Sequence, residues 1–206
     1  MKRTIDEHAA RFDQQAREYD QLERPVYSAC VDLVIEHADP RADEVVLDLG
    51  TGTGAIALSL SAKATQVIGR DISTEMLDVA DRKATERGIE NVSFDTGSFR
   101  SPNYEGPAHV ITSNYAMHHL DDEGKREAIG VIADFRPRRF VLGDVMFFGD
   151  PDPADPDYDP AVDDPATAGM LVVALTDAGF DIRDVIAVSD QVGVIVAEEP
   201  RNGWSR

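Results

Sequence analysis

The feature that most constrains the fold is the stretch EVVLDLGTGTGA, residues 44–55. An apolar run carries an acid, Asp48, and leads into glycines at the alternate positions Gly50, Gly52 and Gly54. Glycine packs poorly, but its backbone adopts conformations that other residues avoid and can lie close to a ligand. The stretch therefore predicts a buried strand, a tight ligand-binding turn and a helix that starts beside it.

Short apolar runs and longer helical patterns alternate along the rest of the chain. Strands are expected over residues 44–50, 65–72, 90–97, 108–114 and 138–147, and helices over residues 54–64, 73–88, 121–135 and 166–179. Ser73 is the expected N-cap of the second helix, and Gly88 its C-terminal stop. Such alternation predicts a doubly wound α/β fold, a mostly parallel sheet with helices on both faces.

The last two apolar runs depart from this rhythm. Residues 180–190 and 191–199 leave no room for a helix between them, so we expect an antiparallel hairpin at the sheet edge, which completes a seven-stranded sheet. Residues 149–165 are rich in proline and aspartate and predict an exposed loop. The loop follows the carboxyl end of a strand, where it could act as a lid.

A chain of 206 residues suits one globular domain. We expect a helical segment over residues 1–40 that covers the site, the main domain over residues 41–199, and a tail over residues 200–206. No apolar stretch reaches the length of a membrane span, and the opening residues lack a signal-peptide core. These patterns favour a cytoplasmic protein without a membrane partner, and they say nothing about its oligomeric state.

The net charge of −19 is the strongest compositional signal. Aspartate outnumbers glutamate and there are only four lysines, which suggests a halophilic protein from a salt-rich cytosol. The charge argues against a nucleic-acid partner, because such binding needs a basic face. The only cationic cluster, RPRR at residues 136–139, is expected to be a polar connection. Cys30 stands alone, which excludes a cysteine-based zinc site, and no metal site is expected.

The identity of the ligand depends on the residues around the glycine turn. Gly50, Gly52 and Ala55 fit the dinucleotide fingerprint G-x-G-x-x-G/A, and Asp71 lies at the distance expected for a ribose contact. Asp48 separates the two interpretations, because a carboxylate beside the turn would repel a pyrophosphate and attract a cation. S-adenosylmethionine carries positive charge on its sulfonium and ammonium groups, and its ribose diol would suit Asp71. We therefore expect S-adenosylmethionine as the cofactor.

The successive motifs VVLDLGTGTG, VIGRDISTEML, VSFDTGSF and VITSNYAMHHL resemble those of the class I S-adenosylmethionine-dependent methyltransferases. The resemblance runs from about residue 44 to the final hairpin. The opening HAARFDQQAREYD is similar to the start of the small-molecule branch, typified by the ubiquinone and menaquinone biosynthesis methyltransferases. The resemblance implies the Rossmann-like methyltransferase fold and transfer of a methyl group to a small organic acceptor by in-line displacement.

The resemblance also implies which residues bind the cofactor. The methionine part would be met by Asp48, Gly50, Thr51 and Gly52, with Gly54 letting the helix start close by, and by Tyr19 from the opening segment. The ribose would be held by Asp71, the adenine by Ile72, Met76, Gly97, Ser98 and Phe99, and the methyl donor would lie over Asn114 and Tyr115. For Ile72, Met76 and Phe99, core packing explains the residue type equally well.

Three positions depart from the family pattern. Ser98 stands where an aspartate is common, so the adenine amino group would meet a weaker acceptor. His109 replaces a frequent acid at the start of the fourth strand. FRPRRF, residues 135–140, replaces a usual Pro-Gly-Gly turn.

His118 and His119 follow the fourth expected strand, where an acceptor would bind. Either could act as a general base, and the alternative is that one caps the next helix while the other packs. No proline pair follows Asn114, unlike in enzymes that methylate adenine amino groups or glutamine amides. A small-molecule acceptor is therefore expected. An NAD(P)-dependent oxidoreductase and a non-catalytic S-adenosylmethionine-binding protein remain the alternatives.

Overall fold

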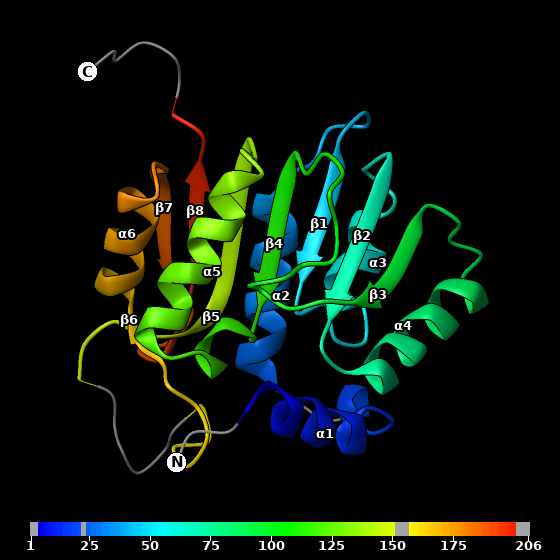
Figure 1. Ribbon diagram of the computed structural model, residues 1–206, viewed down its shortest axis with the longest axis horizontal. Helices are drawn as coiled ribbons and strands as arrows, with labels where there is room; N and C mark the ends of the chain where they lie inside the picture. Colours follow the sequence, from blue (N-terminus) through cyan, green and yellow to red (C-terminus); the bar gives the residue numbers. More distant parts are fainter. Residues whose placement is uncertain (1–3, 22–23, 151–156, 201–206) are drawn as a thin grey trace.

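A computed structural model of the chain describes residues 4–21, 24–150 and 157–200. Its centre is an eight-stranded sheet in the order β3-β2-β1-β4-β5-β8-β7, with β6 paired to β5 off this path (Figure 1). The strands are β1 Val45–Leu49, β2 Gln66–Asp71, β3 Val92–Thr96, β4 Val110–Asn114, β5 Arg139–Phe147, β6 Ala166–Thr167, β7 Asp181–Ala187 and β8 Val192–Glu198. The helices are α1 Ile5–Gln15, α2 Pro25–Ala38, α3 Ala55–Leu60, α4 Thr74–Glu86, α5 Asp122–Asp134 and α6 Ala168–Asp177, with 3₁₀ turns η1 Tyr19–Gln21 and η2 Met117–His119.

The sheet confirms the predicted doubly wound architecture. Strands β1 to β5 pair in parallel, and β8 runs antiparallel between β5 and β7, as predicted for the final hairpin. The sequence pattern did not reveal β6, a two-residue strand at the start of the predicted last helix. The helices of the described residues lack the length and apolar character needed to cross a bilayer.

Helices cover both faces of the sheet, so β1 and β4 are buried along their whole length. One core lies beneath α5 and α6 and includes Leu47, Ile129 and Leu175. The other lies beneath α2 and α3 and includes Cys30 and Val46. Figure 1 shows α5 and α6 in front of the sheet and α2 behind it. Cys30 is fully buried, which agrees with the packing role expected of it.

Helix α3 is shorter than the predicted helix over residues 54–64. The Ser61 hydroxyl donates to the Leu58 carbonyl at 2.7 Å, and the Asn91 amide donates to the carbonyls of Ser61 and Ala64 at 2.9 and 3.1 Å. These side chains satisfy carbonyls at the helix end, so the chain leaves the helix after Leu60. Helix α4 instead has the predicted N-cap, because the Ser73 hydroxyl accepts from the Met76 amide.

The strand order reverses between β1 and β4, and in sheets of this type ligands bind where the order reverses, beyond the carboxyl ends of the strands. Helix α1 runs along this edge of the sheet (Figure 1). It therefore lies over the region where a ligand is expected.

Candidate active site

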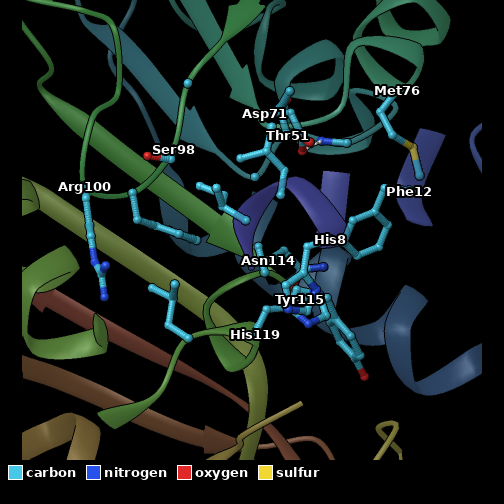
Figure 2. A pocket seen from close by; sticks show the side chains of 18 of the residues that line it. His8, Phe12, Thr51, Asp71, Met76, Ser98, Arg100, Asn114, Tyr115 and His119 are labelled. Carbon is cyan, nitrogen blue, oxygen red and sulfur yellow. Dashed lines mark hydrogen bonds between the residues drawn. The ribbon is translucent and has the colours of Figure 1, made fainter. Parts of the chain in front are cut away.

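A cavity of about 430 Å³ opens at the carboxyl ends of β1, β2 and β4, a volume typical of small-molecule sites (Figure 2). The sheet side of its wall is Gly50, Thr51, Gly52, Asp71, Ile72, Met76, Gly97, Ser98, Phe99, Arg100, Asn114, Tyr115, Ala116, His119, Leu120 and Asp121. The N-terminal side is Thr4, Ile5, His8, Phe12, Tyr19 and Tyr27. Most of the residues predicted to bind a cofactor thus meet in one cavity.

The glycine turn exposes little of its backbone hydrogen-bonding capacity. The amides of Gly50 and Thr51 both donate to the Arg70 carbonyl, at 2.8 and 3.0 Å. The Gly52 amide donates to Asp71 Oδ2 at 2.8 Å, and the Gly54 amide donates to the Thr51 carbonyl at 2.9 Å. Because these four N–H groups are engaged inside the protein, they are not available to hold a phosphate.

The three glycines of the turn have different physical roles. All have positive φ, which favours glycine. A Cβ on Gly50 would lie 2.4 Å from the Ala116 Cβ, and one on Gly54 would lie 3.0 Å from the Ala80 Cβ. A Cβ on Gly52 would meet nothing within 4 Å. Gly50 and Gly54 therefore permit close packing, whereas Gly52 faces open space in the cavity wall.

Asp71 stands at the end of β2 with both carboxylate oxygens facing amides. Oδ2 accepts from Gly52, and Oδ1 accepts from the Ser73 amide at 2.9 Å. Burial raises the pKa of this carboxyl, and the amide hydrogen bonds oppose that effect. A carboxylate has about four acceptor positions, so Asp71 can still accept from a ligand in the cavity.

Asp48 is placed differently from its expected position. Its side chain is only 1% exposed and does not line the cavity; it accepts from the hydroxyls of Thr51 and Thr112, each at 2.7 Å. Burial raises its pKa to about 6, against the lowering effect of both hydroxyls. Asp48 therefore supports the turn from behind, and the direct cofactor contact that the resemblance implied is corrected to a supporting role. Gly54 also lies outside the cavity lining.

Asn114 offers a polar group without a protein partner. Its Oδ1 accepts a hydrogen bond from the Cys30 thiol at 3.1 Å, whereas the buried Nδ2 has no hydrogen-bond partner among the described residues. An unpaired buried donor is costly, so a partner in the cavity would be favourable. The next residue, Tyr115, has φ of 51° and packs its ring edge-to-face against Tyr27, with 5.0 Å between the centroids.

The residues assigned to adenine form one side of the cavity. Met76 packs with Ala16 and Val79 in a small cluster, and Phe99 belongs to the core beneath α5 and α6, so both also serve packing. The Ser98 hydroxyl lies at the wall and accepts from the Ser101 amide at 3.2 Å. Figure 2 shows Ser98 apart from His8 and His119.

The two other departures from the family pattern lie away from the cavity. His109 Nδ1 accepts from the Val45 amide at 3.0 Å, where it joins the starts of β1 and β4. Arg138 pairs with Glu44, and Arg139 pairs with Glu198, at 2.7 Å each. The expectation that residues 136–139 form a polar connection agrees with these pairs.

The N-terminal segment contributes residues that sequence reasoning missed, apart from Tyr19. Asp13 accepts from the Ser73 hydroxyl, and Asp20 accepts from the Thr53 hydroxyl, at 2.6 Å each. These bonds hold the segment over the glycine turn. Ile5, His8 and Phe12 recur at helical spacing on α1, a signal that could have identified the face turned to the cavity.

The two histidines occupy different positions. His119 lines the cavity, and its Nδ1 lies 2.7 Å from Asp163 Oδ1. His118 is buried behind it, with Nδ1 at 2.5 Å from Asp144 Oδ1. Neither caps the next helix, because Asp121 accepts from the Gly124 amide and caps α5. Only His119 is therefore placed to meet a ligand directly.

Asp163 and His119 form a largely buried pair. Burial and the neighbouring His118 lower the pKa of His119 to about 4, so its imidazole is neutral near pH 7. Burial alone would raise the pKa of Asp163, but the His119 hydrogen bond and the nearby imidazoles lower it to about 2. Because an ionised carboxylate only accepts, His119 carries its proton on Nδ1 and keeps a lone pair on Nε2.

Comparison with known proteins gives a consistent family. A family model described as a methyltransferase domain matches residues 46–135. The uncharacterized methyltransferase YcgJ of Bacillus subtilis is 40% identical over 115 residues, which are 54% of this chain and 45% of the relative. Its crystal structure aligns with a TM-score of 0.65 at 29% identity, over 76% of this chain and 70% of that one.

Two further solved structures share the fold. The [4+2]-cyclase SpnF aligns with a TM-score of 0.80 at 18% identity, over 97% of this chain and 98% of that one. Magnesium protoporphyrin IX methyltransferase of Synechocystis PCC 6803, solved with bound S-adenosylmethionine, aligns with a TM-score of 0.67 at 19% identity, over 94% and 83%. The matches span between 45% and 66% of the length of six curated methyltransferase relatives.

Proposed function

The chain belongs to the class I S-adenosylmethionine-dependent methyltransferases, and on that premise we propose that it transfers a methyl group from S-adenosylmethionine to a small organic acceptor. The proposal depends on one observation about the cavity. It is lined by a glycine turn whose amides are engaged, by the buried acid Asp71 and by Asn114, whose Nδ2 has no hydrogen-bond partner among the described residues.

The residues of the cavity fit the cofactor. Asp71 has acceptor positions for the two ribose hydroxyls, and Asn114 Nδ2 is a donor without a partner among the described residues. Gly52 lets the cofactor lie against the backbone, since nothing occupies the space where its Cβ would be. Ile72, Met76 and Phe99 supply an apolar surface for a flat base. The volume of about 430 Å³ suits a small-molecule ligand.

The same contacts argue against the oxidoreductase alternative. A dinucleotide needs free backbone donors for its pyrophosphate at the helix N-terminus. Here the amides of Gly50, Thr51, Gly52 and Gly54 are all engaged, one of them by the Asp71 carboxylate. Asp48 adds negative charge behind the turn, because with a pKa of about 6 it is mostly ionised at pH 7. A cationic ligand is therefore favoured over a phosphate.

S-adenosylmethionine supplies an electrophilic methyl group whose transfer removes the sulfonium charge. The task of this chain is to align the acceptor and to exclude water. Residues His8 and Phe12 of α1 pack against His119, with ring centroids 5.0 and 5.2 Å apart, and cover that end of the cavity. His119 Nε2 is the atom we assign to receive a proton from an acceptor hydroxyl or amine. Asp163 holds its tautomer in place.

The acceptor half of the cavity, formed by α1, Tyr27 and the turn after β4, indicates what kind of acceptor binds there. Rings from Phe12, Tyr27 and Tyr115 surround this region, and they favour a flat or apolar acceptor. The net charge of −19 opposes a nucleic acid.

Two measurements test the proposal. Calorimetric titration of the protein with S-adenosylmethionine, S-adenosylhomocysteine and NAD should show saturable binding of the first two and none of NAD. A screen of phenols, amines and thiols with methyl-labelled cofactor should then give at least one labelled product. The Asp71→Asn variant is the control for the first measurement, and Asp95→Asn, on exposed β3, is its matched counterpart.

The outcomes separate the three possible functions. Tight NAD binding without S-adenosylmethionine binding would identify an oxidoreductase. Cofactor binding without product across the acceptor panel would favour the non-catalytic protein. Label transfer that persists unchanged in Asp71→Asn would show that the cavity is not the site.

A further inference from the structure

Three side chains at the edge of the cavity form a cluster with ligand atoms beyond the single His119 nitrogen that the proposed methyl transfer uses. His118 and His119 come from η2, and Asp163 comes from the segment before β6. One ligand atom from each, an imidazole nitrogen or a carboxylate oxygen, lies within 4.8 Å of the other two. The sequence predicted no metal site, since nothing local announces that Asp163 returns to the histidines.

We propose that His118, His119 and Asp163 bind a divalent transition-metal ion beside the methyl-transfer cavity. Two imidazoles and one carboxylate are the protein ligands of many catalytic zinc sites, which leave at least one coordination position open. The inference does not depend on the proposed function, because metal binding is measured on the protein alone.

The His118 ring is held with one nitrogen aimed at Asp163. Asp144 Oδ1 accepts from the Val145 amide at 2.8 Å, and Oδ2 accepts from the His118 amide at 3.0 Å, so the carboxylate acts as an acceptor toward His118 Nδ1 as well. The proton therefore sits on Nδ1. A carboxylate that fixes the far nitrogen of a metal-binding histidine is the usual outer-shell arrangement of metal sites.

The distance between the His118 ring and the Asp163 carboxylate also supports a metal site. His118 Nε2 lies 3.8 Å from Asp163 Oδ2, too far for a direct hydrogen bond. In a tetrahedral zinc site the ligand atoms lie roughly 3.3 Å apart, because each bond is about 2.0–2.2 Å long. The distance of 3.8 Å from His118 Nε2 to Asp163 Oδ2 and the distance of 2.7 Å from His119 Nδ1 to Asp163 Oδ1 bracket this value. Because they involve the two different oxygens of Asp163, the carboxylate must also turn, by about half an ångström at each oxygen, to hold one ion between the two rings.

Asp163 is held in place by its neighbours. The Asp164 amide donates to the His118 carbonyl at 2.8 Å, and the buried Lys125 ammonium donates to the Asp164 carbonyl. The Asp159 amide donates to Asp163 Oδ2 at 2.8 Å. The carboxylate ligand is therefore positioned before any ion arrives, which lowers the cost of binding.

The charges around the cluster suit a divalent cation. Arg11 lies 4.0 Å from Asp163 and 3.7 Å from Asp159, so Asp159 balances its positive charge. The carboxylates of Asp144 and Asp163 then remain for the cluster, and their side chains are 2% and 4% exposed. In the metal-bound form His119 would bind through Nδ1 in place of its proton.

The test is a zinc titration of tag-free, chelator-dialysed protein in excess Mg²⁺, which occupies the acidic surface. We expect saturation at one Zn²⁺ per chain and, with Co²⁺ as the probe, the visible absorption of a tetrahedral site. Asp163→Asn and His119→Gln should each weaken Zn²⁺ binding at least roughly 100-fold, and Asp144→Asn roughly 10-fold. Asp95→Asn, on exposed β3, and His37→Gln are the matched controls and should bind as the parent does.

A measurement on the unaltered protein covers the case in which a variant fails to fold. In nitrogen NMR of the histidine rings, Zn²⁺ should shift His118 Nε2 and His119 Nδ1 and leave the Nδ1 proton of His118 in place. Absence of saturable Zn²⁺ binding, or unchanged affinity in both Asp163→Asn and His119→Gln, overturns the inference. An NMR spectrum that Zn²⁺ leaves unchanged and that shows protons on both His118 nitrogens also overturns the inference. In that case a doubly protonated His118 ring would bridge the carboxylates of Asp144 and Asp163.

Discussion

The two halves of the cavity are built in different ways. The cofactor half comes mainly from one continuous part of the chain, residues 50–99, in which each strand end delivers its group to the same edge of the sheet, and Asn114 of β4 adds to it. The acceptor half combines α1, Tyr27 of α2 and the turn after β4, and Asp163 backs it from the segment before β6. Its parts are up to about 160 residues apart in the chain.

The cofactor half depends mainly on backbone groups, whereas the acceptor half depends mainly on side chains. In the cofactor half, amides and carbonyls of the turn are already paired, and glycines control how closely segments approach. In the acceptor half, rings and titratable groups from distant segments meet, and their protonation depends on burial. We therefore expect changes in the first half to alter stability and cofactor affinity, and changes in the second to alter turnover.

The largest effect is expected for Gly50→Ala, because Gly50 in the cofactor half packs against Ala116 in the acceptor half. Its Cβ would lie 2.4 Å from Ala116 Cβ at a φ of +70°, so left-handed strain and overpacking add to about 4 kcal/mol of lost stability. Gly52→Ala, which has open space around it, should lose only about 1–2 kcal/mol. Urea unfolding of both variants measures the difference, and equal losses would contradict the packing role of Gly50.

Asp48→Asn tests whether Asp48 supports the turn rather than the ligand. Its pKa in the folded protein, about 6, exceeds the ordinary value of 3.8, so its contribution to stability is complete below pH 3.8 and is lost as pH rises through 6. The loss amounts to about 3 kcal/mol at pH 7. The variant should lack this part of the pH dependence in urea unfolding between pH 4 and pH 7. A pH profile identical to that of the parent would contradict the assigned pKa.

Asp71→Asn sharpens the comparison from the ligand side. Loss of charge-assisted bonds to two hydroxyls should weaken S-adenosylmethionine binding by about 3 kcal/mol, a little over 100-fold in Kd. Calorimetric titration gives this value, and Asp48→Asn should change Kd much less. Equal losses in the two variants would mean that Asp48 contacts the cofactor directly.

His119→Gln addresses the acceptor half alone. We expect kcat to fall roughly 100-fold, the lower end for a general base, because the low pKa makes His119 a weak one. Cofactor Kd should stay the same, since the cofactor half is intact. Once an acceptor is known, steady-state kinetics provides the measurement, and an unchanged kcat would remove His119 from the mechanism.

The smallest effect is expected for Thr4→Ala at the start of α1. Thr4 and Glu7 form a capping box, in which Thr4 Oγ1 accepts from the Glu7 amide. Its loss should destabilise α1 by about 1 kcal/mol and raise the KM of the acceptor more than the Kd of the cofactor. Faster hydrogen exchange in α1 provides a direct readout. A change confined to cofactor Kd would contradict the assignment of α1 to the acceptor half.

The sequence predicted the mostly parallel sheet, the final hairpin and the acid at the end of β2, because each depends on local periodicity or on a motif within a few residues. It misplaced Asp48, since spacing shows that an acid is near a turn but not which side of the turn it faces. It did not identify His8 or Phe12, whose helical spacing indicates a buried face without naming what that face covers.

By itself, then, the sequence determined which segments become strands and helices and that a glycine turn ends the first strand of the sheet, because backbone preferences and apolar periodicity act over short distances. Only the tertiary structure decided that His119 lines the cavity while His118 lies behind it, and that Asp163 reaches both. Those relations join residues more than 40 positions apart, and they arise when packing of the two cores brings the strand ends, α1 and the segment before β6 together.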